Sequence, residues 1–279
     1  MMATPELVTT AGREGWEAIL ADPAGAVVAS DFDGTLPPIV ADPARSRPVE
    51  GALDALARLS RSIGQVALLT GRPALVVTEL SGVTGHPGLG GLVVLGHYGL
   101  ERWEAATGAV TSDPVPPGVE EARQRLPEVL RSAGQPDAFV EDKGSSLAVH
   151  TRRLPEPTAA LQALQGPLTD LAEGVGLRLE PGNLVLELRP PGIDKGLALR
   201  RLVEASGARS LLYAGDDLGD LAAFRAVDAM RSEGLHAVLL AARSSGATEL
   251  TDAADIVVDD PAGVVTVLTA LADGISARG

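Results

Sequence analysis

The sequence predicts an α/β fold in which a parallel sheet, covered by helices on both faces, is interrupted by an inserted α+β domain. Two observations lead to this prediction. Short apolar runs alternate with helical segments before residue 101 and again after residue 190. Between these stretches the predicted strands follow one another closely in pairs, which is typical of antiparallel hairpins. Because parallel strands need helical crossovers, the two patterns belong to different domains.

The first third of the chain contains three apolar runs of strand length. Each is rich in Val, Leu and Ala and lacks a polar face, as expected for strands buried on both sides. Pro73 suits the first turn of the helix that follows the second run. We predict strands at 26–30, 65–69 and 92–95, with helices at 13–21, at 49–62 and after Pro73.

The middle of the chain has a different pattern. Residues 109–118 are rich in Pro and Gly, which indicates a turn or linker. From residue 119 to 189 the order is helix, two strands, helix, two strands. The predicted strands are 138–143, 146–152, 176–180 and 183–189. We therefore expect a core of residues 1–101 and 190–279 and an inserted domain of residues 102–189.

The α/β alternation returns in the last part of the chain. The first helix there ends at Gly207, because glycine is the usual residue after a helix end. The predicted elements are a helix at 195–206, a strand at 211–214, a helix from 218, strands at 236–240 and 255–258, and a helix at 262–275.

Composition argues against several kinds of partner. The 279 residues include 23 Lys and Arg against 37 Asp and Glu, a formal charge of −14, so we expect no nucleic-acid or membrane partner. The absence of cysteine excludes disulfides and thiolate metal sites and favours a reducing compartment, the cytoplasm. The N-terminus lacks the pattern of a signal peptide, and no apolar run approaches the roughly 18 residues of a membrane span.

Polar residues follow the predicted strands at the positions where α/β proteins carry their active sites. Ligands bind at the carboxyl ends of parallel strands, and four segments place polar side chains there. Two carboxylates two positions apart, after a buried strand, suit a nucleophile and its acid–base partner at a metal site. The candidates are Asp31 and Asp33, then Thr70, Gly71 and Arg72, then Lys195, and finally Asp216, Asp217 and Asp220.

Each segment also has a purely structural interpretation. Asp31 or Asp33 alone could cap a turn, since Asp-Gly is a common turn pair, and Thr70 could cap the next helix. Lys195 could be a surface lysine, although the helix dipole disfavours a cation in the first turn by roughly 0.3–1 kcal/mol. The three later aspartates could form a cap and an acidic first turn, yet a divalent cation would relieve their repulsion. The four segments in this order are more specific than any one of them.

Together these segments resemble the motifs of the haloacid dehalogenase-like phosphatases. The matching residues are Asp31-Phe32-Asp33-Gly34-Thr35, Thr70, Lys195, and Gly215-Asp216-Asp217 with Asp220, and the resemblance covers about residues 26 to 260. It implies a Rossmann-like parallel-sheet core with an inserted α+β cap domain for substrate recognition. It also implies phosphoryl transfer, which needs an in-line nucleophile and cationic stabilisation of the phosphoryl oxygens.

The resemblance implies a role for each motif residue. Asp31 would attack phosphorus and form an aspartyl phosphate, while Asp33 would protonate the leaving group and then deprotonate water. Lys195 would neutralise charge on Asp31 and the phosphate. The other roles are Mg²⁺ binding by Asp31, the main-chain carbonyl of Asp33 and Asp216, orientation of metal-bound water by Asp217 and Asp220, and phosphoryl binding by Thr70, Gly71 and Arg72.

The strands of the inserted domain present charged side chains on one face. Alternate residues of a strand share a face. The pairs that share one are Glu141 with Lys143, His150 with Arg152, and Glu187 with Arg189. The structural interpretation is the solvated face that antiparallel sheets commonly have. The functional interpretation is a surface that hydrogen-bonds the hydroxyls of a sugar.

Details of this domain resemble the trehalose-6-phosphate phosphatases. The matching segments are Tyr98-Gly99-Leu100-Glu101, Glu141-Asp142-Lys143, Leu147 to Arg152, Leu186 to Pro190, Asp194-Lys195-Gly196 and Tyr213 to Asp217. By that resemblance Glu141, Lys143 and Glu187 would grip the distal glucose, and Arg152 would assist near the phosphate or the ring.

The resemblance implies Mg²⁺-dependent hydrolysis of trehalose 6-phosphate to trehalose and phosphate, the last step of trehalose biosynthesis. A trehalose-6-phosphate synthase is a possible functional partner. Three alternatives remain open. They are a phosphatase for another glycosyl phosphate, such as sucrose phosphate or mannosylglycerate phosphate, a phosphomutase, and a non-catalytic sugar-phosphate sensor.

Overall fold

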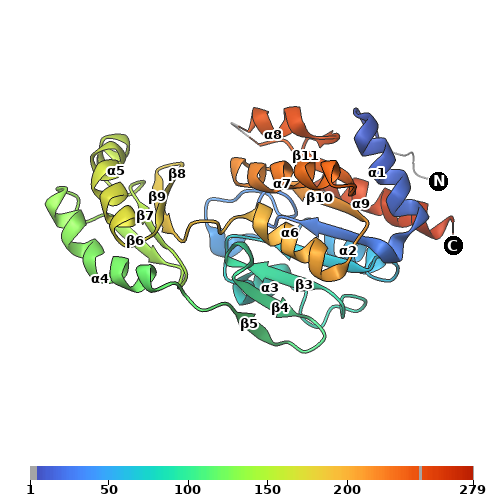
Figure 1. Ribbon diagram of the computed structural model, residues 1–279, viewed down its shortest axis with the longest axis horizontal. Coiled ribbons are helices and arrows are strands. Elements are labelled where there is room, and N and C mark those ends of the chain that lie inside the picture. Colours follow the sequence, from blue (N-terminus) through green and yellow to red (C-terminus); the bar gives the residue numbers. More distant parts are fainter. Residues whose placement is uncertain (1–4, 245–246, 279) are drawn as a thin grey trace. The chain divides into compact units, whose positions relative to one another are not determined.

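The computed structural model describes residues 5–244 and 247–278. The chain forms two compact units, one of Met1–Ser112 and Asp194–Gly279 and the other of Asp113–Ile193 (Figure 1). The first unit is discontinuous in the sequence because the second is inserted into it. Each unit has a hydrophobic core of its own, as expected of a domain.

The first unit is built on a large sheet, which among the described residues has eight strands in the order β12-β11-β10-β1-β2-β3-β4-β5. The strands from β12 to β3 are parallel, and β4 and β5 are antiparallel to their neighbours. The predicted α/β class with a parallel sheet is therefore confirmed. The bounds are β1 (Ala26–Ser30), β2 (Gln65–Leu69), β3 (Val93–Gly96), β4 (Glu101–Glu104), β5 (Val110–Ser112), β10 (Ser210–Gly215), β11 (His236–Ala242) and β12 (Ile256–Val258).

Helices cover both faces of this sheet. One face packs against α1 (Thr10–Ala21), α2 (Ala52–Leu59), α3 (Ala74–Ser81) and α9 (Pro261–Ser276), and the other against α6 (Lys195–Ser206), α7 (Leu221–Ser232) and α8 (Thr248–Ala253). Val28 of β1 belongs to the first core and Val27 to the second, so the strand is buried on both sides. None of the helices in residues 5–244 and 247–278 combines the length and apolarity needed to cross a membrane.

The chain after β3 differs from the prediction. We expected the inserted domain to begin at residue 102 and a linker at 109–118, but β4 and β5 pair with the large sheet. The second unit therefore begins at Asp113, and it ends at Ile193 rather than at residue 189. The sequence of β4 hides this pairing because three of its four residues are charged and only Trp103 is buried.

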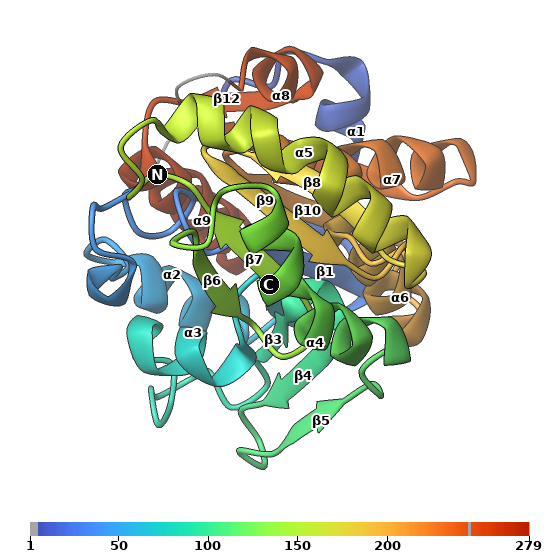
Figure 2. The same ribbon diagram turned by 90° about the vertical axis from the view of Figure 1, so that its left-hand side faces the viewer.

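The second unit consists of an antiparallel sheet and two helices (Figure 2). Within residues 113–193, all of which the structure describes, the strand order is β6-β7-β9-β8. The bounds are β6 (Phe139–Asp142), β7 (Leu147–His150), β8 (Arg178–Gly182), β9 (Val185–Arg189), α4 (Pro117–Ser132) and α5 (Pro157–Gly174). Leu147, Val149, Leu186 and Leu188 pack with both helices, so the alternate residues of these strands form the opposite, charged face.

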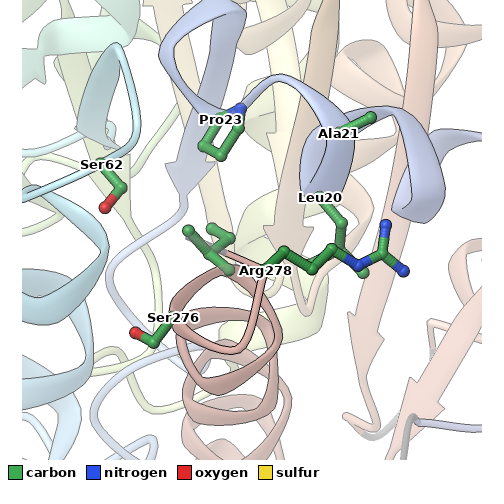
Figure 3. A pocket seen from close by; sticks show the side chains of 7 residues that line it. Leu20, Ala21, Pro23, Ser62, Ser276 and Arg278 are labelled. Atoms are coloured by element: carbon green, nitrogen blue, oxygen red, sulfur yellow. The ribbon is translucent and has the colours of Figure 1, made fainter.

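A surface pocket of about 550 Å³ lies beside α1 and the end of α9 (Figure 3). Its lining consists of Leu20, Ala21, Pro23, Ser62, Ile275, Ser276 and Arg278. Pro23 precedes β1 and Ser62 precedes β2, so the pocket lies at the amino-terminal edge of the sheet. Asp31 follows β1 at the other edge, and the pocket is therefore separate from the predicted site.

Candidate active site

The loop after β1 is shaped to meet the loop after β10. The N–H of Asp31 donates to the carbonyl of Ala214 at 2.8 Å and so continues the pairing of the two strands. Gly34 has a φ of +82°, which favours glycine. A Cβ on Gly34 would lie 2.0 Å from Oδ2 of Asp216, so a side chain there would separate the loops. The first and last predicted motifs are therefore in contact.

Lys195 lies buried between two carboxylates. Its Nζ is 3.0 Å from Oδ2 of Asp31 and 2.7 Å from Oδ1 of Asp220. Only 6% of the Lys195 side chain is exposed, so the surface-lysine interpretation is wrong. Asp194 caps α6 by accepting the N–H of Leu197 at 2.8 Å, which places Lys195 in the first turn. The two carboxylates offset the unfavourable effect of the helix dipole on this cation.

Burial and charge shift the pKa values in this cluster. Burial raises the pKa of Asp31 well above its ordinary value, against the opposing effect of Lys195. Burial alone would lower the pKa of Lys195, but the carboxylates of Asp220 and Asp31 outweigh it and raise that pKa. Lys195 therefore keeps its proton, and it supplies a permanent positive charge beside Asp31.

Asp220 holds the loop after β10 in place. Its Oδ1 accepts hydrogen bonds from Lys195 and, at 2.6 Å, from the hydroxyl of Tyr213. Its Oδ2 accepts the N–H of Asp216 at 3.0 Å and that of Asp217 at 3.3 Å. Four donors thus hydrogen-bond to one buried carboxylate. Two of them are the backbone N–H groups of Asp216 and Asp217, so these bonds hold the backbone of both aspartates in place.

The aspartates of this site suit a divalent cation. Carboxylate oxygens of Asp31, Asp217 and Asp220 lie within 4.8 Å of one another. Asp216, a predicted ligand, lies outside this group, and its Oδ1 accepts the Thr35 hydroxyl at 3.1 Å. Burial, followed by the charges of Asp217 and Asp220, raises the pKa of Asp216 to about 7. An excess of buried carboxylates is relieved by a hard cation, and a donor set made only of oxygens suits Mg²⁺.

The residues after β2 turn toward the first loop. Thr70 is buried, and its Oγ1 accepts the N–H of Arg72 at 3.1 Å, so it does not cap α3. The Arg72 guanidinium donates to both oxygens of Asp33, from Nε at 2.5 Å and from Nη2 at 2.7 Å. Arg72, which we expected on the phosphoryl group, is therefore paired with the predicted acid–base residue. At Gly71 a Cβ would lie 2.7 Å from a tyrosine hydroxyl, so glycine is needed there.

Three hydroxyl residues of the site were given no role on the basis of the sequence, although Thr35 and Tyr213 lie within the matched segments. Thr35 contacts Asp216, Tyr213 contacts Asp220, and Ser46 donates to Oδ1 of Asp33 at 3.0 Å. A tyrosine within an apolar central strand was a usable signal, because a buried tyrosine hydroxyl usually finds a partner. Ser46 gave no such signal, since it lies 13 residues after Asp33 in a loop that belongs to none of the motifs.

The charged face of the second unit carries the predicted sugar-binding residues. Lys143 Nζ donates to Oε2 of Glu187 at 3.2 Å. Nε2 of His150 lies 2.9 Å from Oε2 of Glu141. The side chains on this face are thus connected to one another rather than separately solvated. Hydrogen-bonding groups held in this way can exchange partners with the hydroxyls of a ligand.

Two further polar residues of the second unit, Arg152 and Ser146, have different partners. Arg152 is exposed, and its Nη2 donates to the carbonyl of Asn183 at 3.4 Å rather than to the Lys143–Glu187 pair. Ser146 donates to Oε1 of Glu187 at 2.6 Å, a contact that the sequence analysis did not predict. Glu187 therefore has a partner on each of its oxygens.

Solved structures share this fold. The C-terminal domain of the trehalose-6-phosphate phosphatase of C. albicans matches with a TM-score of 0.75 at 20% identity, covering 97% of this chain and 98% of that one. A haloacid dehalogenase-like hydrolase from Bacteroides thetaiotaomicron matches with a TM-score of 0.58 at 18% identity, covering 88% and 99%. The fold is that of the haloacid dehalogenase-like hydrolases.

Sequence comparison narrows the class to a family. A model described as trehalose-phosphatase matches residues 29–255. The trehalose-phosphate phosphatase of Mycobacterium avium (strain 104) is 34% identical over 262 residues, which cover 87% of this chain and 61% of that protein. The chain thus spans about three-fifths of the length of that relative. It belongs to the trehalose-phosphatase family.

Proposed function

We propose that the protein is a Mg²⁺-dependent phosphatase that hydrolyses trehalose 6-phosphate to trehalose and phosphate. The observation that carries the proposal is the buried Lys195 between Asp31 and Asp220 at the carboxyl edge of the sheet. A fixed cation beside a carboxylate can stabilise the charge on a bound phosphoryl group while the carboxylate attacks. Membership of the trehalose-phosphatase family supports the choice of ester.

The first step transfers the phosphoryl group to Asp31. A carboxylate oxygen of Asp31 bonds to phosphorus, and the bond from phosphorus to the sugar oxygen breaks on the opposite side. Asp33 acts in its protonated form and gives that proton to the departing oxygen, which leaves as a hydroxyl of trehalose. Lys195 and Thr70 stabilise the phosphoryl oxygens, and the product of the step is an aspartyl phosphate on Asp31.

The second step releases phosphate. A water molecule attacks phosphorus and gives a proton to Asp33, which is now ionised. The bond between phosphorus and Asp31 breaks, so both aspartates return to their starting states. The charge of Lys195 is available in both steps because its raised pKa keeps it protonated.

Mg²⁺ would be held by Asp31, the main-chain carbonyl of Asp33 and Asp216, with Asp217 and Asp220 orienting its water. When bound, the ion supplies positive charge at the phosphoryl oxygens. Asp220 itself is occupied by four hydrogen bonds, which supports an orienting role.

The second unit would select the sugar. Glu141, Lys143 and Glu187 lie on one charged face and offer acceptors and a donor for the hydroxyls of the distal glucose. Arg152 is exposed on the same unit and would assist near the phosphate or the ring. Polar groups of a site reject a substrate that lacks their partners, so this face would distinguish a disaccharide from a small ester.

A phosphate-release assay on a panel of sugar phosphates tests the proposal. Trehalose 6-phosphate should be the best substrate, and a chelator should abolish release until Mg²⁺ is restored. Better turnover of sucrose phosphate or mannosylglycerate phosphate would reject the assignment of the sugar. Transfer of phosphate to another sugar without release would indicate a mutase, and Mg²⁺-dependent binding without turnover would indicate a sensor.

Three further predictions concern the role of the protein in the cell. We predict that the reaction is the last step of trehalose biosynthesis, that the protein works together with a trehalose-6-phosphate synthase, and that it is located in the cytoplasm. A coupled assay with a synthase and fractionation of cells would test them. A rate of trehalose 6-phosphate hydrolysis that does not change when the synthase is added would contradict the functional pairing.

A further inference from the structure

Asp33 is held by two side chains that come from different loops. Arg72 donates to both of its oxygens, and Ser46 donates a third hydrogen bond to Oδ1 at 3.0 Å. Ser46 is 1% exposed, whereas the side chain of Asp33 is 30% exposed. Both oxygens of the carboxyl group are thus anchored, while part of the side chain stays exposed to solvent. A proton-transferring group needs both features.

A short 3-10 turn at Pro43–Arg45 places Ser46 beside this carboxylate. Asp42 caps the turn by accepting the N–H two residues later at 3.1 Å, and the proline provides a fixed φ at its first position. The N–H of Ser46 closes the turn onto the carbonyl of Pro43 at 3.4 Å. The same carbonyl accepts Nη1 of Arg72 at 3.0 Å, so one turn supports both partners of the carboxylate.

We propose that Ser46 is a positioning residue for proton transfer by Asp33, a role that rests on the function proposed above. Without a fixed partner, an aspartate on a loop samples several rotamers, and few of them place its oxygen against the leaving group. The Ser46 hydroxyl restricts that choice from a buried position. Arg72 also restricts the rotamers of Asp33, but we predicted that Arg72 binds the phosphoryl group as well. A substitution of Ser46 therefore tests the positioning of Asp33 without changing a predicted phosphoryl ligand.

The dependence of the rate on the leaving group isolates this role. Hydrolysis of an alkyl phosphate such as trehalose 6-phosphate requires a proton on the departing oxygen, whereas p-nitrophenolate leaves readily without one. The value of kcat/KM reports the steps up to release of the alcohol. We expect Ser46→Ala to lower kcat/KM about tenfold for trehalose 6-phosphate and less than about twofold for p-nitrophenyl phosphate. Ser46→Thr keeps the hydroxyl and should restore most of the loss.

Two controls separate positioning from a loss of structure. Ser81→Ala removes another buried serine, whose hydroxyl donates to the carbonyls of Val77 and Thr78 and accepts the N–H of Val83, and it should leave both rates unchanged. An Asp33→Asn protein has no carboxyl proton to position, so adding Ser46→Ala should not lower its kcat/KM for trehalose 6-phosphate any further.

The results of these assays also distinguish a failure of the proposed phosphatase function from a failure of the proposed role of Ser46. A wild-type protein inert toward every phosphate ester would overturn both. A wild-type protein that hydrolyses trehalose 6-phosphate would retain the function, and an equal loss on the two esters, or no loss on either, would then overturn the role of Ser46 alone. Additive losses in the Asp33→Asn background would do the same.

Discussion

The charged cluster around Lys195 in the first unit is buried, whereas the His150–Glu141 pair on the charged face of the second unit is accessible. The side chains of Lys195 and Asp31 are only 6% and 7% exposed, whereas those of His150 and Glu141 are 32% and 46% exposed. Breaking a buried pair by removing one partner costs about 3–5 kcal/mol. An exposed pair contributes about 0–1 kcal/mol. The cluster of the first unit is therefore fixed, and the charged face of the second can change partners.

This difference separates two tasks. A nucleophile and its cation gain from a fixed geometry, because misplacement of a reacting group reduces the rate steeply. A sugar-binding face gains from side chains that give up a partner for a ligand hydroxyl at little cost. We therefore expect substitutions in the buried cluster to affect every substrate. Substitutions on the exposed face should affect only the sugar ester.

Asp31→Asn should have the largest effect and tests whether the buried cluster carries the chemistry. The amide has nearly the same shape but is not a nucleophile, so turnover of every phosphate ester should fall by at least about 10⁴-fold. The measurement is phosphate release, with circular dichroism to show that the fold is kept. As a control, Glu141→Gln on the exposed face should retain hydrolysis of p-nitrophenyl phosphate. Full activity of Asp31→Asn would show that the nucleophile is another group.

Lys195→Met tests whether the cluster is fixed energetically. The substitution leaves Asp31 and Asp220 buried without their cation, so the free energy of unfolding at pH 8 should fall by about 3–5 kcal/mol. Urea titration without metal measures this. The control variant Arg131→Met removes the cation of an exposed pair with Glu128 on α4 of the second unit, and it should change the free energy of unfolding by no more than about 1 kcal/mol. Equal losses in the two variants would remove the energetic distinction between the units.

Glu187→Ala tests whether the charged face recognises sugar. The variant leaves Lys143 and Ser146 without their acceptor, and we expect kcat/KM for trehalose 6-phosphate to fall about 100-fold. For p-nitrophenyl phosphate the loss should stay below about threefold, since that ester offers no sugar hydroxyls. Glu173→Ala, at an exposed position of α5, serves as the control. A uniform loss on both esters would assign Glu187 to the fold instead.

The pH dependence of Mg²⁺ binding should give the smallest effect. The pKa of Asp216 is raised to about 7, chiefly by burial and then by the charges of Asp217 and Asp220. The metal-free folded protein thus binds this proton more tightly than the unfolded chain, whose aspartates titrate near 3.9. Metal-free stability should therefore fall as the pH rises from about 4 to about 7.

Magnesium must displace the same proton. Its apparent affinity should rise by up to about tenfold per pH unit below 7 and level off above. Calorimetric titrations in buffers of different ionisation enthalpy would measure both the affinity and the proton released. An affinity that does not change with pH, or no proton release near pH 6, would contradict this assignment of Asp216.

The parallel strands of the large sheet, including the edge strand β12, could be predicted from the sequence, whereas the hairpin at the other edge could not. The strands at 26–30 and 65–69 were confirmed at the predicted residues, because buried parallel strands read as continuous apolar runs. The hairpin of β4 and β5 was missed because a charged edge strand is defined by its partner rather than by its own pattern. The short helix α8 gave no periodic signal of sufficient length.

In the site, the sequence identified the motif residues but not the hydrogen-bond partners that hold them. The unusual position of a lysine in a first helical turn argued against a surface lysine, and the structure shows Lys195 buried between two carboxylates. Ser46 and Thr35 each contribute one hydroxyl whose partner is set by the folded structure: Asp33 lies 13 positions from Ser46, and Asp216 lies 181 positions from Thr35. The ion pair of Arg72 with Asp33 was not expected either. The sequence shows which residues are reactive, but not which neighbour each one meets.

The pairing of β1 has a consequence for the order of folding. Thr35 and Asp216 are 181 positions apart, and β1 needs β10, which follows the whole inserted unit. On a ribosome, the emerging chain would hold β1 with one edge unpaired until the last third is synthesised, whereas the inserted unit can complete its core earlier. We expect pulse-labelled amide exchange during refolding to protect residues 113–193 before β1. Premature termination before β10 should then yield a protein prone to aggregation.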